Sequence, residues 1–148
     1  GSEGATVRLA PCCCPVPGDR IKGYLGRGEG LVVHTQTCAV GRRLFERDGE
    51  RWIEVNWSDE PTRTFEVAAV VTVSNGKGVL ARVASAITSA EADITHVLMA
   101  DEVTGQEALD LRFVFSVRDK AHLDAVLSNL RRVPAVLQAQ RVVSGVGR

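Results

Sequence analysis

The sequence predicts an α+β protein in which a small β/α module precedes a ferredoxin-like βαββαβ domain. Three observations lead to this class. Residues 65–73 are apolar and mostly β-branched, which is typical of a buried strand, and a glycine-containing turn and a helical pattern follow them. A similar order of strand, helix and strand recurs closer to the C-terminus. The first 57 residues instead divide into short runs separated by glycine, with one helical segment between them.

The boundary between the two parts is expected at residues 58–64, which are polar, contain Pro61 and lack periodicity. Residues 12–57 then form the first module, and residues 65–148 form the second domain. Residues 1–11 show no pattern and are expected to be a leader, in which Gly1-Ser2 is typical of the scar that tag removal leaves. We therefore expect the chain to be part of a longer protein.

The composition is that of a folded protein without a strong charge. Eighteen basic and eighteen acidic residues give zero net charge, and 45% of the residues are hydrophobic. These values argue against disorder, and against a chain that binds nucleic acid or membranes through its overall charge. The four cysteines, three of them consecutive, do not form a comfortable disulfide framework, so reduced thiols and a cytoplasmic location are expected.

The first module is expected to contain three strands and one helix. Strands are predicted at residues 21–25, 31–34 and 52–57, and a helix capped by Thr35 or Thr37 is predicted to run through Arg47 with Val40 and Leu44 turned inward. About 45 residues are too few for a hydrophobic core to stabilise the module alone. A bound metal or a neighbouring domain would supply the missing stability.

The second domain has clearer periodicity. Strands are predicted at residues 65–73, 92–100, 109–117 and 136–143, with a turn at Thr104-Gly105. The first helix would bury Leu80, Val83, Ala84 and Ile87, and a second helix would span residues 120–132, with His122 at its start facing solvent. Both helices cover one face of a four-stranded antiparallel sheet, so the uncovered face and the edges predict a homodimer.

Four side chains in the first module form a candidate metal site, namely Cys12, Cys13, His34 and Cys38. His34 and Cys38 are four residues apart at a helix entry, where both can point to one place. Three thiolates and an imidazole suit tetrahedral zinc, which would make the module zinc-finger-like. The alternative is that the cysteines only pack as small apolar groups.

The turn between the first strand and helix of the second domain forms a candidate ligand site. A glycine-rich turn at a helix start directs backbone N–H groups toward a bound anion, here a carboxylate. An apolar amino acid could place its carboxylate on this turn and its ammonium near Asp93 of a second copy. The candidate residues are Asn75, Gly76, Lys77, Gly78, Val79, Leu80, Asp93 and Ile94. The alternative is a plain strand-to-helix connection without a ligand.

The first module has a modest excess of basic residues. Arg42 and Arg43 lie in its predicted helix, where they could contact RNA phosphates. Most such runs are only a solvated face. The sequence agrees with both an RNA contact and a solvated face.

Several motifs resemble the C-terminal region of the long RelA/SpoT stringent-response proteins. They are Cys12-Cys13-Cys14-Pro15-Val16-Pro17-Gly18-Asp19, Ile21-Lys22-Gly23-Tyr24, Gly26-Arg27-Gly28, and His34 followed by Cys38. The second half is similar to an ACT domain, with Asn75-Gly76-Lys77-Gly78-Val79-Leu80 where that family usually has Asp-Arg-x-Gly-Leu-Leu. The resemblance covers about residues 10–143.

This resemblance implies a zinc-finger or ribosome-intersubunit module followed by a regulatory ACT domain. The parent chain would be a GTP diphosphokinase and (p)ppGpp pyrophosphohydrolase, and this part of it is expected to be non-catalytic because no His-Asp pair occurs in the sequence. We expect the ACT domain to bind a branched-chain amino acid at a dimer interface and to control the enzyme allosterically. The alternative is a module that docks on ribosomal RNA and dimerises without a small ligand.

Overall fold

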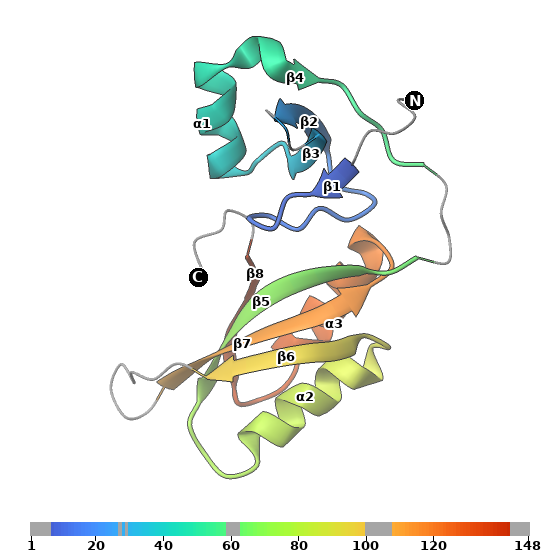
Figure 1. Cartoon of the computed structure of the whole chain (residues 1–148). Helices are drawn as coiled ribbons and strands as arrows, with labels where there is room; N and C mark the ends of the chain where they lie inside the picture. The colour runs from blue at the N-terminus through green and yellow to red at the C-terminus, as the bar shows by residue number, and fades with distance from the viewer. Residues whose placement is uncertain (1–6, 27, 29, 59–62, 100–107, 143–148) are drawn as a thin grey trace.

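The computed structural model describes residues 7–26, 28, 30–58, 63–99 and 108–142, which form two four-stranded sheets (Figure 1). The first sheet has the order β1-β3-β2-β4. The hairpin of β2 and β3 is antiparallel, as the two apolar runs around the glycines predict, and β1 adds to it in parallel. The bounds of its strands are β1 Val7–Leu9, β2 Ile21–Gly26, β3 Gly30–Thr35 and β4 Trp52–Ile53.

Two expectations for this sheet were wrong. Residues 7–9 of the expected leader form β1, where Val7, Arg8 and Leu9 pair with residues 31–33 of β3. Three residues are too short a run to show a period, so the sequence alone does not reveal this strand. The expected strand over residues 52–57 is only two residues long, because β4 pairs with β2 at Gly23 and Tyr24 and no further.

One α-helix, α1 (Ala39–Arg47), follows the first hairpin, and a short 3-10 helix, η1 (Gly49–Arg51), leads into β4. The residue before α1 is Cys38, and neither Thr35 nor Thr37 caps the helix, contrary to expectation. Val40 and Leu44 are half-buried. The most buried residue of α1 is Gly41, which allows the helix to lie close to β3.

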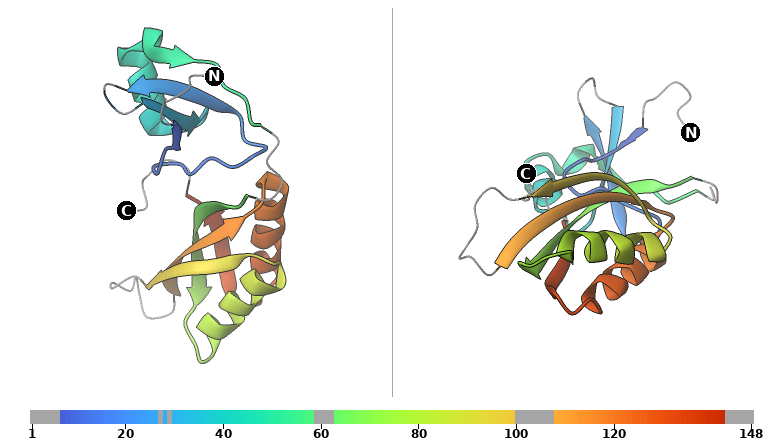
Figure 2. Two further views of the ribbon diagram at one scale, coloured as in Figure 1. Left: turned by 45° about the vertical axis from the view of Figure 1, so that its right-hand side comes forward. Right: turned by 90° about the horizontal axis from the view of Figure 1, so that it is seen from below.

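The second sheet has the order β6-β7-β5-β8, and each of its pairs is antiparallel. The two helices lie on the same face of this sheet (Figure 2), so the predicted ferredoxin-like βαββαβ fold is confirmed. The bounds are β5 Phe65–Ser74, α2 Val79–Ser89, β6 Asp93–Met99, β7 Ala108–Val117, α3 Lys120–Arg131 and β8 Val136–Arg141.

Alternation along the two central strands builds the core of this domain. Residues at every second position of β5 and β7 are buried against the helices, as a period of two dictates for a sheet covered on one face. The core residues on these strands are Phe65, Val67, Ala69, Val71, Val73, Leu111, Phe113, Phe115 and Val117. The face of α2 that packs on them consists of Val79, Val83 and Ile87. Leu80 was expected there but is 42% exposed, because the buried face follows Val79, Val83 and Ile87, and Leu80 lies about 100° around the helix from Val79.

The segment that follows the three cysteines packs against the second domain. Val16 is fully buried in the same apolar cluster as Phe65 and Leu123. The amide of Lys120 at the start of α3 donates to the carbonyl oxygen of Pro17 at 2.7 Å. Trp57 donates from its indole nitrogen to the Asp19 carbonyl oxygen at 3.1 Å. The two sheets are therefore joined by packing and hydrogen bonds as well as by the linker.

Some sequence-based expectations fall outside the described residues, among them Gly1-Ser2, the turn at Thr104-Gly105, and most of the expected linker over residues 58–64. The domain boundaries themselves stay a prediction. In the part of the chain that the structure covers, no helix is long and apolar enough to cross a membrane.

Candidate metal centre and amino-acid site

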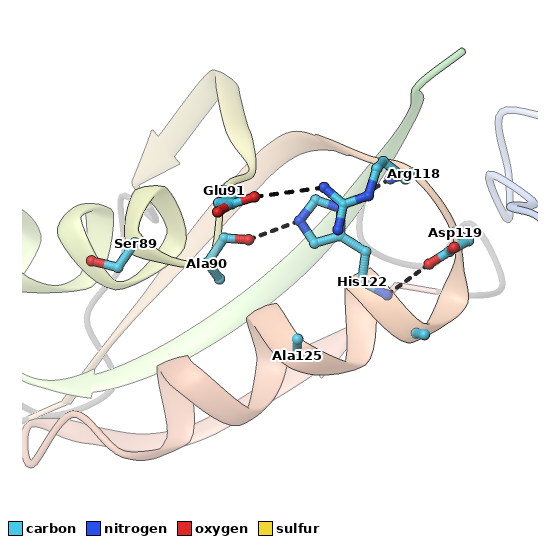
Figure 3. A pocket seen from close by; sticks show the side chains of 8 residues that line it. Ser89, Ala90, Glu91, Arg118, Asp119, His122 and Ala125 are labelled. Carbon is cyan, nitrogen blue, oxygen red and sulfur yellow. Dashed lines mark hydrogen bonds and ion pairs between the residues drawn. The ribbon is translucent and has the colours of Figure 1, made fainter. Parts of the chain in front are cut away.

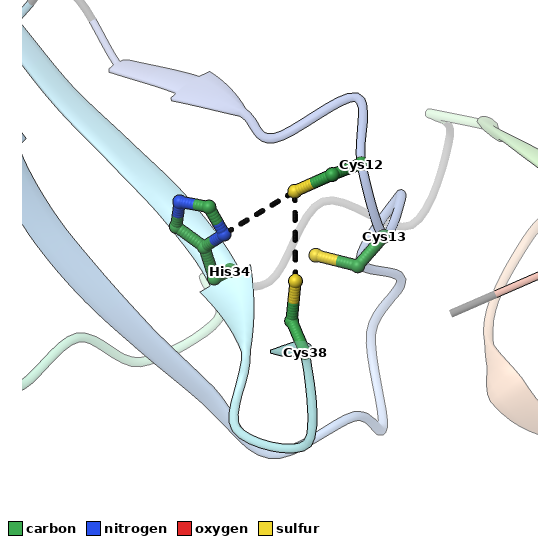
Figure 4. Close-up of side chains that lie close together, drawn as sticks. All are labelled: Cys12, Cys13, His34 and Cys38. Atoms are coloured by element: carbon green, nitrogen blue, oxygen red, sulfur yellow. Dashed lines mark hydrogen bonds between the residues drawn. The ribbon is translucent and has the colours of Figure 1, made fainter. Parts of the chain in front are cut away.

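The structure brings the four predicted metal ligands together (Figure 4). The ligand atoms of Cys12, Cys13, His34 and Cys38 all lie within 4.8 Å of one another. The Cys12 sulfur is 3.5 Å from Nδ1 of His34 and 3.5 Å from the Cys38 sulfur. Ligand atoms around a tetrahedral zinc ion are ~3.5–3.8 Å apart, as its metal–ligand bond lengths require. The cluster could therefore hold a metal ion.

Three separate elements supply these side chains. Cys12 and Cys13 lie in the turn after β1, His34 lies near the end of β3, and Cys38 precedes α1. The turn brings adjacent cysteines to one site because the amides of Cys13 and Cys14 both turn back to the Ala10 carbonyl oxygen. Cys14 lies apart from the group, with a positive φ of 48° and its sulfur directed to the Pro11 carbonyl oxygen. The tight turn thus separates the third cysteine from the first two.

Burial sets the protonation of these groups in the absence of metal. It raises the pKa of the Cys12 thiol well above its ordinary value, and the neighbouring Cys13 and Cys38 sulfurs add to the rise. It also raises the pKa of Cys13 to about 11, although the Thr35 amide that donates to this sulfur opposes the change. Burial lowers the pKa of His34. At neutral pH the metal-free site therefore holds a neutral imidazole and protonated Cys12 and Cys13 thiols.

Two residues that support His34 were not found from the sequence. A Cβ atom on Gly41 would lie 3.4 Å from Cγ of His34, so this glycine lets α1 lie directly on the imidazole ring. Trp52 contacts the ring from another side, edge-on, with ring centroids 5.6 Å apart. The sequence did contain a sign of the role of Gly41. It lies three residues after Cys38, and residues three apart on a helix share one face.

The predicted amino-acid loop has the geometry of an open helix start. Gly78 precedes α2 with φ of 73°, a left-handed conformation that glycine adopts without strain. Because glycine has no side chain to accept from the first-turn amides, and because the first turn has no acidic residue, the positive end of α2 is not neutralised locally. The Val79 amide donates to the Gly76 carbonyl oxygen, so this N–H group is not free to bind a ligand.

Asp93 and Ile94 do not lie near this loop within one chain. Ser74, just before the loop, pairs with Ala108 at one end of β7, whereas Asp93 pairs with Ser116 near the other end. Eight residues along a strand correspond to ~26 Å. All eight predicted residues can therefore line one site only if a second copy contributes Asp93 and Ile94.

Arg82 of α2 lies beside this loop and was missed in the sequence analysis. One of its terminal guanidinium nitrogens lies 3.3 Å from the position that a Cβ atom on Gly78 would take. It is one helical turn after Gly78, and its amide donates to the Gly78 carbonyl oxygen. A guanidinium is a stronger carboxylate partner than the Lys77 ammonium because it can bind both oxygens.

The basic side chains named from the sequence lie on α1. Arg42 and Arg43 are both exposed, and neither forms an ion pair with another described residue. They are separate from the metal cluster, since Cys38 and Gly41 lie on the covered side of this helix. Their position agrees equally with an RNA contact and with a solvated face.

His122 was expected to face solvent, and this was wrong because the residue is 5% exposed. Its ring points toward the backbone of Ala90 (Figure 3). Its Nδ1 accepts from the Arg118 amide at 3.0 Å, so its Nε2 carries the proton and donates to the Ala90 carbonyl oxygen at 2.8 Å. The surrounding cavity of about 390 Å³ lies between the end of α2 and the start of α3. Both ring nitrogens are used, so His122 joins the two helices and is not available for chemistry.

Comparison with known proteins assigns both parts of the chain. Residues 1–58 match the RelA/SpoT RIS domain, and residues 61–141 match the ACT domain. The chain belongs to the RelA/SpoT family. Its RIS region contains the Cys/His cluster, and its ACT domain contains the α2 loop. The family resemblance that the Cys-Cys-x-Pro-x-Pro-Gly-Asp motif indicated is thereby confirmed.

The curated relatives agree with this assignment over nearly the whole chain. The chain is 36% identical over 146 residues to the bifunctional (p)ppGpp synthase/hydrolase RelA of Mycobacterium tuberculosis, covering 97% of this chain and 19% of that protein. It is 29% identical over 141 residues to SpoT of Escherichia coli, covering 95% and 20% respectively. The chain thus spans about a fifth of the length of the curated relatives it matches.

Among solved structures, the ACT domain from the GTP pyrophosphokinase of Chlorobium tepidum is similar. It matches with a TM-score of 0.46 and 14% identity, covering 53% of this chain and 99% of that chain.

Proposed function

We propose that this chain is a non-catalytic regulatory part of a (p)ppGpp synthetase/hydrolase, in which the ACT domain binds a small apolar amino acid. The ligand is a branched-chain amino acid held between two copies of the domain. Its binding favours one arrangement of the dimer and thereby changes alarmone synthesis and hydrolysis in the rest of the protein. Such control requires that the ligand bind the two states with different affinity, by about 1–3 kcal/mol.

The start of α2 is the observation that carries this proposal. Gly78 leaves the first turn of the helix without a capping side chain, and the guanidinium of Arg82 lies beside it. A carboxylate placed there would accept from backbone amides and from Arg82 while compensating the helix dipole. Because the remaining predicted contacts come from Asp93 and Ile94 of β6, which pair with the far end of β7, the complete site is proposed to form across a dimer.

We also propose that the Cys/His cluster holds zinc with a structural role. The group of buried apolar residues around the site is small. Two of its four members, Cys13 and Cys38, are themselves candidate metal ligands. A zinc ion would replace the missing hydrophobic stabilisation by joining the turn after β1, strand β3 and helix α1. All four ligand positions would come from the protein, which leaves no open position for a substrate.

Calorimetric titration of the chain with valine, leucine and isoleucine tests the amino-acid proposal, with glutamate as the charged control. We expect saturable heats for the branched-chain amino acids and none for glutamate. Gly78→Val should lose binding, because a β-branched residue is strained at φ of 73°. Gly28→Val is the matched control, since Gly28 has a similar φ of 76°, lies outside the candidate site, and a Cβ atom there would meet no described atom within 4 Å. Equal heats for every ligand, or no heat at all, would contradict the proposal.

The competing function is docking on ribosomal RNA through the RIS region, with an ACT domain that only dimerises. The exposed arginines at positions 42 and 43 of α1 are the side chains that would make this contact. Binding to RNA that weakens steeply with salt, and that is lost when both arginines are changed to glutamine, would support it. A fragment that binds valine in a salt-insensitive way supports the amino-acid proposal instead.

A further inference from the structure

A cavity of about 490 Å³ lies at the junction between the RIS region and the ACT domain. Three segments of the chain meet around it: the turn after the Pro-Val-Pro sequence, the loop between β3 and α1, and the adjoining ends of α3 and β8. Its size is within the range of small-molecule sites, which often lie between domains. The residues that line it are Gly18, Asp19, Arg20, Thr35, Gln36, Thr37, Lys120 and Arg141.

The residues that line this cavity carry a net positive charge, because Asp19 and Arg141 neutralise each other and Arg20 and Lys120 remain. Arg141 donates to both carboxylate oxygens of Asp19, at 2.9 and 2.7 Å, and the Val16 amide donates to one of them at 2.9 Å. The single acidic group is thus fully occupied. Arg20 forms no ion pair with any described residue. Lys120 forms only an exposed pair with Asp124, which is worth little and is easily exchanged.

Two residues that line the cavity each contain a buried polar atom that lacks a hydrogen-bond partner. Among the described residues, three buried side-chain nitrogen or oxygen atoms are unsatisfied, and two of them belong to cavity residues: the Thr35 hydroxyl and Nε of Arg141. Leaving a buried donor unpaired is costly, so such groups commonly mark a place where a water or a ligand atom completes the structure. Both atoms can donate, which suits an anionic oxygen.

The loop that lines one side of this cavity also holds the metal cluster. Thr35, Gln36 and Thr37 connect His34 to Cys38, and the Thr35 amide donates to the Cys13 sulfur. Lys120 and Arg141 of the ACT domain also line the cavity. A ligand in the cavity would therefore contact both parts of the chain and fix them relative to each other.

We propose that this cavity binds the phosphate group of a small phosphate monoester. Arg20 and Lys120 supply the positive charge, and Thr35, Thr37 and Arg141 supply further donors. This site is separate from the amino-acid site at the start of α2, and it does not depend on that proposal. Phosphate is favoured over a carboxylate because it offers three oxygens to donors that approach from three segments of chain.

Amide chemical shifts of the 148-residue chain test this site. Titration with inorganic phosphate and with glycerol 3-phosphate should cause saturable shifts at the amides of Gln36, Thr37 and Lys120. Sodium chloride at equal ionic strength should not cause them. A four-nucleotide RNA, compared at equal phosphate concentration, distinguishes the phosphate of a small molecule from that of a nucleic-acid backbone.

Arg20→Gln should weaken phosphate binding by about tenfold or more, because a charged hydrogen bond is lost. Arg43→Gln is the matched control, since it removes the same charge from the exposed face of α1 outside the cavity. It should leave the affinity within about twofold. Equal losses in both variants, no saturable shift with either phosphate, or shifts caused by RNA alone would each overturn the proposal.

Discussion

Arg141 lies at the point where the RIS region and the ACT domain meet. Its guanidinium binds Asp19 through both carboxylate oxygens and also donates to the Cys14 carbonyl oxygen at 3.0 Å. The side chains of Arg141 and Asp19 are 13% and 7% exposed. The guanidinium and the carboxylate are both planar and are shielded from water. Removing either member of such a pair is destabilising because it leaves the other charge buried and unpaired.

Changing Arg141 to glutamine should therefore destabilise the protein by about 3 kcal/mol, because the buried Asp19 carboxylate would lose its counter-charge. Urea unfolding measures this difference. Arg118→Gln is the matched control, since Arg118 pairs with Glu91 at 3.9 Å and both side chains are more than half exposed. That change should cost about 0.5 kcal/mol or less. Similar costs for both variants would show that the Asp19 pair contributes no more than a surface contact.

The sequence alone groups some residues of the site correctly and misses the partners of others. Cys12, Cys13, His34 and Cys38 could be named as one cluster because their side-chain chemistry restricts what they do together. Arg141 could not be linked to Asp19, because the two residues are far apart in sequence and neither is part of a periodic pattern. His122 was misplaced for a related reason: its partners are the backbone groups of Ala90 and Arg118, which have no sequence signature.

At the scale of elements, the turn after β1, the end of β3 and the start of α1 should form one unit held by metal. Zinc added to chelator-treated protein should change the fluorescence of Trp52, whose ring lies against His34. A Trp57→Phe background leaves Trp52 as the only indole. Cys38→Ser should abolish the change, and Cys14→Ser should retain it because the Cys14 sulfur is outside the cluster. A fluorescence change that survives Cys38→Ser would contradict a site built on these four residues.

The pH dependence of zinc affinity follows from the protonation of the free site. Burial raises the pKa of Cys12 and raises that of Cys13 to about 11, so both release a proton when zinc binds near neutral pH. These two protons alone should make the affinity fall by at least about a hundredfold for each unit of pH lowered, one factor of ten for each proton. Affinity independent of pH would argue against thiolate ligands.

The metal-free protein responds to acid through His34. Because burial lowers the pKa of His34, the folded state prefers the neutral ring. The resulting stability is complete above the ordinary pKa of histidine, roughly 6.5, and is lost as the pH falls through the lower folded-state pKa. Thermal unfolding of the chelated protein at several pH values measures this loss, which zinc should shift to lower pH.

The accuracy of the predicted elements differed between the two parts of the chain. In the ACT domain, ten-residue strands such as β5 and β7 give a clear alternation, and every predicted strand and helix is present. In the RIS region, β1 and β4 have three and two residues, and their existence depends on pairing with β3 and β2. Long elements carry their own pattern, whereas short ones are defined only by their neighbours.

On the scale of the whole molecule, one strand leaves an apolar surface uncovered. The edge strand β6 exposes Val97, Leu98 and Met99, by 41%, 58% and 55%. Adjacent apolar side chains on an unpaired edge favour association with a second copy. The opposite edge, β8, exposes Leu137 by 62%, so exposure by itself does not select the edge.

Leu98→Lys should therefore weaken a homodimer by tenfold or more in sedimentation measurements, since lysine on an edge strand opposes pairing. Leu137→Lys is the matched control on β8 and should leave the dimer intact. Because Asp93 and Ile94 begin the same strand as Leu98, the variant that dissociates should also lose its heat with valine. A dimer lost only in Leu137→Lys would place the contact at β8, and a monomeric wild type would mean that no dimer forms. Either result would leave the start of α2 without the second copy that the amino-acid site requires.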